Sequence, residues 1–489
     1  MTDERMRVAI VHYHLRPGGV TRVIENAVAS LKERVAAVAI SGPNGPTFER
    51  KRFPCPIVEL PALAYEEGAP ACSPDELAIQ LREAATHALG GAPDVWHIHN
   101  HSLGKNATLT AAVHRLAQRG ERLLLQIHDF AEDGRPSNYR FLTERLSHSN
   151  PGGFSEQLYP DAAHIHYAAL NARDLNILAT AGAPTQRLHA LANPVALDDS
   201  EVDVIASDQR FFLYPTRAIR RKNIGELLLW AAASRPGDRF GVTLAPNNPT
   251  AKPIYDRWVQ FAQELNLPVE FEVGAKSPLP FPALMRSAHA LMTTSVAEGF
   301  GLAFLEPWLA GRPLLGRNLA DITSDFVQEG VNLSGMYERV EVPLDWVGER
   351  DFRRTLDRGL KTAWSDYGRV PAPGDQEQAF AASVTGGRVE FGRLPEAMQE
   401  TVIERIAKSQ QAKSEISPAS LDAAIADARV VQDNRRRIQD AYNLRQYGDR
   451  LFSIYHSIAQ SEPAPLASLD AGALLNAFMS PQRFCLLRT

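Results

Sequence analysis

Residues 290–316 read ALMTTSVAEGFGLAFLEPWLAGRPLLG, and this stretch decides the fold. The apolar run at 290–293 predicts a buried strand, residues 302–310 predict a helix, and residues 313–316 predict a second strand. Two glycines in the loop after the first strand free its backbone. A strand, a glycine loop, a helix and another strand in this order predict a parallel sheet covered by helices.

The same alternation continues toward both ends of the chain. Residues 7–12 predict a strand, followed by a glycine turn and a helix at 20–31 whose apolar residues recur at helical spacing. Further strands are expected at 35–40, 57–60, 94–98, 122–127, 163–167, 211–214, 240–244 and 269–273. Further helices are expected at 74–89 (with a capping box of Ser73 and Glu76), 103–117, 171–181, 223–233, 253–265, 281–286, 395–410 and 433–458.

The length of 489 residues indicates more than one domain. An acidic stretch without helical period, residues 194–208, divides the alternation and is expected to be a linker. The fold class is therefore α/β, with two doubly wound Rossmann-like domains facing each other across a cleft. We expect one domain over 1–200, a second over 201–430, and a C-terminal helix with a tail over 431–489. Residues 331–430 give no clear topology, and their segments PAPGDQ and SVTGGRVEFG are expected to be loops.

The composition excludes several classes of protein. Apolar residues make up 44% and charged residues 22% of the chain, which is typical of a globular protein. The 52 basic and 57 acidic residues give a net charge of −5, without the basic bias of a nucleic-acid-binding protein. Three cysteines without a CxxC motif indicate neither a disulfide framework nor a metal site. With no long apolar run and no signal-peptide pattern, we expect a cytoplasmic protein; peripheral membrane contact and the oligomeric state stay open.

Candidate functional residues are sought just after the strands, because ligands of doubly wound sheets bind at the carboxyl ends of the strands. Gly18 and Gly19 precede a helix, where they form either a tight turn or a place at which backbone amides meet an anion. His128 follows the strand at 122–127. It is either an exposed imidazole that bonds a substrate hydroxyl or polarises a leaving group, or a capping or core histidine.

Polar residues also follow two neighbouring strands of the first domain. His97, His99 and His101 alternate, but no carboxylate or cysteine stands at matching spacing, so a polar rim of the cleft is favoured over a metal site. The stretch after His128 either forms a solvated loop or binds a small charged or polyhydroxylated acceptor. Its polar members are Asp129, Glu132, Asp133, Arg135 and Asn138.

The second domain carries two cations and two carboxylates of interest. Arg217 and Lys222 precede a helix, and two cations at a helix N-terminus suit a diphosphate, although a solvated charged turn is the alternative. Arg220 and Arg221 lie between them and leave the choice of cations ambiguous. Glu298 stands on the loop after a strand. Glu306 falls in an otherwise apolar predicted helix, where a buried carboxylate needs a partner such as a ribose diol.

Together these segments resemble the retaining GT-B glycosyltransferases of family 4, over residues 7–330 and the helix near 440–458. The signature of that family is a pair of glutamates separated by seven residues, here Glu298 and Glu306 with GFGL between them. The family also has an Arg-x4-Lys pair, a glycine-rich first loop and a histidine after a strand of the N-terminal domain. These correspond to Arg217 and Lys222, to Gly18 and Gly19, and to His128.

The resemblance implies a retaining enzyme that moves a hexose from a UDP- or GDP-sugar to a hydroxyl of a small or glycan acceptor, without a metal or another cofactor. It implies catalytic roles for His128, Arg217, Lys222 and Glu298. It implies that the donor contacts Gly18, Gly19, Arg217, Lys222, Glu298, Gly299, Phe300, Gly301, Leu302 and Glu306. In this scheme the two cations neutralise the diphosphate, Glu306 holds the ribose, and Glu298 and His128 hold the sugar.

The first domain would then bind the acceptor, for which Asp129, Arg135 and Asn138 are the candidate residues. Two alternative functions remain open at this point. One is a sugar-nucleotide epimerase of the same fold, and the other is a protein that binds a nucleotide sugar without catalysis. The base and sugar of the donor and the identity of the acceptor stay open as well.

Overall fold

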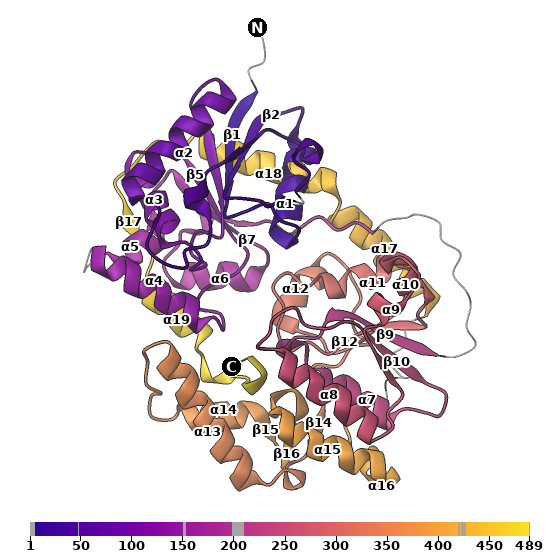
Figure 1. Cartoon of the computed structure of the whole chain (residues 1–489). Coiled ribbons are helices and arrows are strands. Elements are labelled where there is room, and N and C mark those ends of the chain that lie inside the picture. The colour runs from indigo at the N-terminus through magenta and orange to yellow at the C-terminus, as the bar shows by residue number, and fades with distance from the viewer. Residues whose placement is uncertain are drawn as a thin grey trace. The chain divides into compact units, whose positions relative to one another are not determined.

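The computed structural model describes residues 5–46, 48–149, 153–197, 210–418, 421 and 427–488. These residues form two compact units (Figure 1). The first unit comprises Met1–Pro194 and Tyr442–Met479, and the second comprises Val195–Ala441 and Ser480–Thr489. Each contains a parallel sheet with helices, which confirms the predicted α/β class. From residue 198 onward, the expected linker lies outside the described residues.

The first unit is built on a seven-stranded parallel sheet with the order β3-β2-β1-β4-β5-β7-β8. Its strands are β1 (Met6–His12), β2 (Val35–Ser41), β3 (Ile57–Glu59), β4 (Val95–His99), β5 (Leu123–Ile127), β7 (Ile165–Ala169) and β8 (Leu188–Ala190). Its helices are α1 (Gly19–Leu31), α2 (Pro74–Leu89), α3 (Ala107–Gln118), α4 (Pro136–Ser149), α5 (Phe154–Leu158), α6 (Ala172–Thr180), α18 (Leu444–Ala459) and α19 (Ala471–Phe478). A small antiparallel pair joins β6 (Pro160–Asp161) to β17 (Ala467–Ser468).

The helix α18 completes the core of this first unit. Its apolar residues, among them Leu451 and Tyr455, pack with the apolar faces of α1 and β1. Gly448 permits this close packing, because a Cβ there would lie 2.8 Å from the Cβ of Ser30 in α1. The predicted single helix over 433–458 is wrong. It is two helices, and Asn443 begins the second by accepting a hydrogen bond from the backbone of Gln446.

The second unit is built on a five-stranded parallel sheet with the order β11-β10-β9-β12-β13. Its strands are β9 (Phe211–Arg217), β10 (Arg239–Leu244), β11 (Val269–Phe271), β12 (Ala290–Thr293) and β13 (Leu314–Gly316). Its helices up to residue 328 are α7 (Ile224–Ala233), α8 (Lys252–Glu264), α9 (Val273–Lys276), α10 (Phe281–Ser287), α11 (Glu306–Leu309) and α12 (Ala320–Gln328). The capping box predicted for α2 and most predicted strands are confirmed to within a few residues.

The segment without a predicted topology adds helices and a small antiparallel sheet to the second unit. The sheet contains β14 (Glu341–Pro343), β15 (Val384–Thr385) and β16 (Arg388–Glu390), in the order β14-β16-β15. The helices are α13 (Glu349–Asp366), α14 (Asp375–Ser383), α15 (Glu396–Lys408), α16 (Gln410–Ser414) and α17 (Ala428–Ala441). The expected loop SVTGGRVEFG is therefore a hairpin, since Gly386 and Gly387 take the positive φ angles of a tight two-residue turn.

The last residues return to the second unit rather than staying with α18. The guanidinium of Arg393 donates to the carbonyl of Gln482 at 2.7 Å, and the buried thiol of Cys485 donates to the carbonyl of Gly392 at 3.4 Å. We expected residues 431–489 to form one C-terminal segment, but this segment is divided between the two units.

Both sheets have a point at which the strand order reverses. The first sheet grows outward from β1 on one side and from β4 on the other, and the second sheet does the same from β9 and β12. In open parallel sheets, ligands bind beyond the carboxyl ends of the strands at this point. The loops after these four strands are therefore the places to look for a site in each unit.

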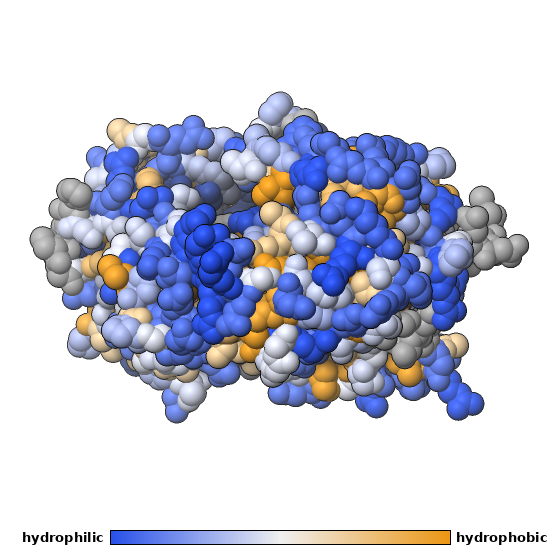
Figure 2. Space-filling view, turned by 90° about the horizontal axis from the view of Figure 1, so that it is seen from below, coloured by the Kyte–Doolittle hydropathy of each residue, from blue (hydrophilic) through white to orange (hydrophobic). Residues whose placement is uncertain are grey.

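No helix among the described residues is both long enough and apolar enough to cross a bilayer. Hydrophilic residues cover most of the face in Figure 2, with hydrophobic ones between them.

Candidate functional site

In the second unit, the loops after β9 and β12 bring oppositely charged side chains together. The chain leaves β9 through a 3-10 turn, η4 (Arg220–Lys222). The ammonium of Lys222 bonds Oε1 of Glu298, which lies on the loop after β12. Arg221 donates to the other oxygen of Glu298 at 3.2 Å and to the carbonyl of Ala297 at 2.7 Å. The reversal point of the sheet thus carries a cluster of two cations and one carboxylate.

The hydroxyl of Ser295 completes the surroundings of the Glu298 carboxylate by donating to Oε1 at 2.6 Å. The side chain of Glu298 is only 9% exposed. Burial by itself raises the pKa of this carboxyl, but Lys222 and Arg221 outweigh burial and hold the pKa below its ordinary value. Burial also lowers the pKa of the Lys222 amine, and the charge of Glu298 opposes that shift. The Glu298 carboxyl is therefore ionised at neutral pH.

Two hydroxyl groups fix the backbone of the η4 turn against the sheet. Thr294 donates to the carbonyls of Lys222 and Asn223, both at 3.0 Å. The hydroxyl of Tyr214, in β9, lies 3.2 Å from the carbonyl of Lys222 and 3.0 Å from the hydroxyl of Ser295. The η4 turn, which we call the cation turn, and the loop that carries Glu298 are thus held by the strands that they follow.

Arg217 and Glu306 lie differently from what the sequence suggests. Arg217 donates to the carbonyl of Ala245 at 2.9 Å and to the amide oxygen of Asn247, so its side chain is directed to the loop after β10 rather than to Glu298. The predicted helix over 302–310 is broken into a 3-10 turn, η5 (Leu302–Phe304), and the short α11. Glu306 is consequently the first residue of α11 and not an interior one.

The glycine loop between the two glutamates is tightly built. Gly301 has a φ of 92°, and a Cβ there would lie 3.0 Å from the ring of Phe304 and 3.1 Å from Ile322. Phe300 is buried against the ring of Phe326, whereas Leu302 is 40% exposed. The sequence GFGL therefore needs glycine at 301 for both conformation and space.

In the first unit, Gly18 and Gly19 lie at the start of α1, just after β1. A Cβ on Gly19 would meet no atom within 4 Å, and one on Gly18 would meet only the carbonyl of Arg16, at 3.7 Å. Neither glycine has a φ that a side chain would disfavour. The described residues of the chain thus leave open space beside both glycines.

Of the two possibilities left open for His128, an exposed imidazole or a capping or core histidine, the structure shows a core histidine. Its ring is buried, with Nε2 2.9 Å from Nδ1 of His99, and its backbone N–H donates to the side-chain oxygen of Asn100 at 2.7 Å. The tertiary reason is that β4 and β5 are neighbours, so the residues at their carboxyl ends face each other.

The expected polar rim of His97, His99 and His101 is wrong, because all three are fully buried. His97 is bonded to the hydroxyl of Tyr455 at 2.7 Å and to the side-chain oxygen of Gln126 at 2.8 Å. No group of three metal-ligating side chains is found in the described part of the chain.

These buried imidazoles are held neutral by their surroundings. Burial, reinforced by neighbouring histidines, lowers the pKa of both His12 and His128 to about 3. Burial lowers the pKa of His97 and His101 to about 4. At neutral pH, His128 is therefore an uncharged hydrogen-bonding group.

Lowering the pH from 7.5 to 5 should destabilise the first unit. The pKa values of its buried histidines lie below that of an unfolded histidine, so their contribution to stability is complete above about pH 6.5 and is lost as the pH falls toward 3–4. Each such histidine should cost up to about 2 kcal/mol of unfolding free energy at pH 5. Hydrogen exchange of β4, corrected for its intrinsic pH dependence, measures this loss.

The second unit supplies the internal control for that measurement, because His289 is its only histidine. Exchange in β10 should respond much less to the same change of pH. An equal response of both sheets, or no response of β4, would show that the histidines do not set the stability of the first sheet.

The side chains of the residues predicted to bind the acceptor are engaged in contacts within the protein. Asp129 and Arg135 pair with each other, and Asn138, in α4, donates to the carbonyl of Leu103 at 2.8 Å and accepts from Lys105 at 3.3 Å.

Glu132, also in that stretch, is buried, and its carboxylate accepts from the hydroxyl of Tyr159 at 3.1 Å. Its burial raises the pKa to about 7. Glu132 is therefore an interior group rather than part of a solvated loop.

Comparison with known proteins supplies the remaining evidence. No family model matches the chain. The mannosylglucosyl-3-phosphoglycerate synthase of Petrotoga mobilis is 29% identical over 363 residues, which are 68% of this chain and 69% of that protein. The structure of HepE from Anabaena in complex with UDP and glucose has a TM-score of 0.53 at 11% identity, over 93% of this chain and 100% of that one. Sucrose-phosphate synthase from Thermosynechococcus elongatus has a TM-score of 0.50 at 14% identity, over 93% and 99%.

This chain is a glycosyltransferase of the GT-B fold. The two doubly wound sheets and the place of α18 in the first unit are the basis for the fold, and the similarity to the Petrotoga synthase is the basis for the activity.

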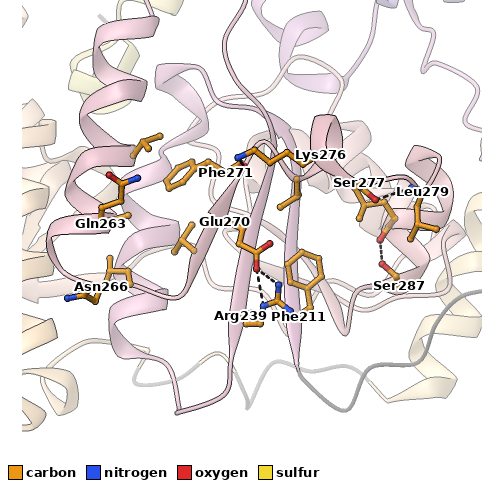
Figure 3. A pocket seen from close by; sticks show the side chains of 16 residues that line it. Phe211, Arg239, Gln263, Asn266, Glu270, Phe271, Lys276, Ser277, Leu279 and Ser287 are labelled. Carbon is orange, nitrogen blue, oxygen red and sulfur yellow. Dashed lines mark hydrogen bonds and ion pairs between the residues drawn. The ribbon is translucent and has the colours of Figure 1, made fainter.

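The glycosyltransferase also has a recess of about 930 Å³ at the edge of its second sheet, beside β11 (Figure 3). An ion pair between Arg239 and Glu270 lies on its wall, and Lys276 donates to the carbonyl of Phe271 at 2.9 Å. None of the residues expected to bind a donor lines this recess. Its volume alone does not make it the site, because the cluster of Lys222, Arg221 and Glu298 lies elsewhere, at the reversal point of the sheet.

Two contributors to the charge cluster of the glycosyltransferase were not singled out from the sequence. Arg221 was left ambiguous, yet it is the second cation on Glu298. Ser295 was not named, although it lies three residues before Glu298 and directly after the predicted strand and its threonines. The position of Ser295 after a strand was the available signal for it.

Proposed function

We propose that this glycosyltransferase transfers a hexosyl group from a nucleoside-diphosphate sugar to a hydroxyl group, with retention of configuration and without a metal ion. The observation that carries the proposal is the cluster of Lys222, Arg221 and Glu298 at the reversal point of the second sheet. Two cations close to a turn that opens a helix suit a diphosphate. They would also do the electrostatic work that a divalent cation does elsewhere.

The donor is assigned to the second unit. Lys222 and Arg221 would bind the diphosphate, with Arg217 within the same loop region, and Glu306 would bind the ribose. Glu298 and backbone amides at Gly299–Leu302 would bind the sugar. The HepE structures contain UDP and UDP-glucose, which supports a UDP-sugar as the first donor to test, with a GDP-sugar beside it.

The proposed reaction breaks the bond between the anomeric carbon and the diphosphate oxygen, and the electron pair of that bond stays on the oxygen. Lys222 and Arg221 stabilise the charge that develops there. The acceptor hydroxyl attacks the same face of the sugar and passes its proton to the leaving phosphate oxygen. Glu298 is engaged by two cations and a hydroxyl, which reduces its ability to act as a nucleophile, so we propose front-face attack rather than a glycosyl-enzyme intermediate.

The acceptor is assigned to the first unit, where Gly18 and Gly19 leave open space beside the start of α1 and His128 supplies a neutral imidazole near the end of β5. A cation and an imidazole lie at the ring of Tyr65 nearby. Lys105 Nζ lies 5.6 Å from the centre of this ring, and His14 Nε2, whose pKa burial lowers, lies 3.1 Å from its hydroxyl.

The positive charges of Lys105 and Arg16 near Tyr65 support an anionic acceptor. Burial raises the pKa of Tyr65, the charge of Arg16 opposes that shift, and the negative charge of Asp129 adds to it. The name of the Petrotoga relative, a mannosylglucosyl-3-phosphoglycerate synthase, points to the same class of compound. We therefore propose an acceptor that carries a phosphate or carboxylate group.

A donor and acceptor panel tests the proposal. Thermal unfolding is measured with UDP- and GDP-sugars, since a ligand at 100 times its dissociation constant adds about 2.7 kcal/mol of stability. Transfer is then measured with 3-phosphoglycerate glycosides and with the same glycosides after phosphatase treatment. We expect transfer that prefers the phosphorylated acceptor, retains the anomeric configuration and is unchanged in EDTA. A strict need for a divalent ion would contradict the metal-independent mechanism, and release of free sugar without any acceptor would favour an epimerase.

A further inference from the structure

The helix α15, in the segment that the sequence left without a topology, touches the cation turn directly. Arg220, the first residue of η4, forms a two-pronged ion pair with Glu396 of α15, with Nη2 2.9 Å from Oε2. Asn223, the residue after Lys222, accepts a hydrogen bond from Nε2 of Gln399 of α15 at 3.0 Å. The turn that carries Lys222 is thus held at both ends by one helix.

The contact of Gln399 with Asn223 fixes an unusual backbone. Asn223 has a φ of 50°, a left-handed conformation in which a residue other than glycine needs support. Its side-chain amide donates to Oε2 of Glu226 at 2.7 Å while its oxygen accepts from Gln399. Gln399 also donates to the carbonyl of Phe391 at 3.1 Å. All three side chains of this network are buried, so no water replaces the bonds if one partner is removed.

A glycine makes the approach of α15 to α7 close enough for these bonds. A Cβ on Gly225 would lie 2.1 Å from Oε1 of Gln399 and 2.9 Å from the ring of Trp258. Gly225 has an ordinary helical conformation, so the reason for glycine here is space rather than backbone strain. Gly225, which lies two positions after Asn223 in α7, therefore leaves the space that the side chain of Gln399 occupies.

A second buried chain of charges ties the same end of α7 to the small sheet. Arg317, which follows β13, pairs with Glu226 of α7 and with Glu390 of β16, the latter at 2.6 Å. All three side chains are buried. The segment after residue 331 is thus attached to the start of α7 through two networks that meet at Glu226.

We propose that Glu396 and Gln399 are positioning residues for Lys222. They fix the η4 turn and the left-handed Asn223, so that the ammonium of Lys222 meets Glu298 and, in the donor complex, the diphosphate. The inference rests on the proposed role of Lys222 in binding the donor. It gives the segment 331–418 a function in the reaction, since a small displacement of a catalytic cation is enough to slow a transfer strongly.

The same helix offers a matched control. Glu400, one turn after Glu396, also pairs with an arginine of another element, Arg257 of α8, at 2.6 Å. That pair does not touch η4 or Asn223. Glu396→Gln and Glu400→Gln therefore remove the same charge from the same helix, and only the first removes it from the cation turn.

Three single variants and one double variant of the full chain test the proposal with the nucleoside diphosphate and the donor. Glu396→Gln and Gln399→Met should each lower kcat about tenfold or more and weaken binding of the nucleoside diphosphate, with KM for the acceptor unchanged. Glu400→Gln should leave all three values within about twofold. Exchanging the charges, with Arg220→Glu and Glu396→Arg together, should restore part of the kcat that Glu396→Gln loses. Exchange of the peptide spanning 218–226 should be faster in the two impaired variants only.

The outcomes separate this inference from the proposed function. If Lys222 variants lose activity while Glu396→Gln and Gln399→Met keep it, the positioning role is overturned and the proposed function stands. If Glu396→Gln and Glu400→Gln lose activity equally, α15 acts through general stability and the positioning role is overturned as well. If the Lys222 variants keep full activity, the proposed function fails first.

Discussion

Replacing Lys222 by methionine should lower kcat/KM for the donor by about three orders of magnitude. The amine is the least exposed cation of the cluster, and its charge-assisted contact to a leaving diphosphate would be lost while the aliphatic part of the side chain is kept. Most of the loss should appear in kcat, because the charge on the phosphate oxygen grows as the bond breaks. Steady-state kinetics with the donor identified by the panel measures it.

Lys252→Met serves as the control, since Lys252 forms an exposed pair with Asp256 one turn away in α8. It should leave kinetics and melting unchanged. Lys222→Met should still fold, because Arg221 continues to compensate the buried Glu298 carboxylate. Full activity in a folded Lys222→Met protein would rule out its proposed role.

Glu298→Gln and Glu306→Gln should affect ligand binding in different ways. Glu298 compensates the charges of Lys222 and Arg221, so its neutralisation leaves these cations more attractive to a diphosphate. We expect nucleoside diphosphate binding to be unchanged or a few-fold tighter in Glu298→Gln, while transfer falls by about two orders of magnitude because a contact to the sugar is lost. Glu306→Gln should weaken the donor and the nucleoside diphosphate together, because the ribose is common to both.

Calorimetric titration of both variants with both ligands, alongside the melting temperature, checks this contrast. Parallel losses for the two ligands in both variants would mean that neither glutamate distinguishes the sugar from the nucleotide. A collapse of the melting temperature in Glu306→Gln would assign that residue to the packing of α11 instead.

The residues near the reversal point of the second sheet show what a sequence can provide. The strand at 290–293 is a short apolar run, and its position in an alternating pattern is enough to place Glu298 at the carboxyl end of a strand. The turn after β9 follows the same logic, so the meeting of Lys222 with Glu298 fits the expectation that residues after strands converge. The helix α13 also has a clear apolar period at Phe352, Leu356 and Leu360, which could have been used to predict it.

Burial and partner choice were not accessible in the same way. The place of His128 after a strand left open whether it is exposed or in the core, and only the pairing of β4 with β5, which brings it against His99, shows that it lies inside. Arg217 and Arg221 are equally basic, and the direction of each side chain depends on whether Ala245 or Glu298 lies beside it in the fold. The contacts of Glu396 and Gln399 join positions 176 residues apart, which no local pattern encodes.

The place of α18 in the first core has a consequence for the synthesis of the protein. The ribosome delivers the first sheet, then all of Val195–Ala441, and only afterwards Tyr455, which closes the core and bonds His97. The usual vectorial order, in which the N-terminal domain is finished before the next one begins, is therefore unavailable to this chain. The second unit is likewise incomplete until the segment around Cys485 has been synthesised, because this segment packs onto Gly392. Neither core is complete until residues beyond Ala441 have been synthesised.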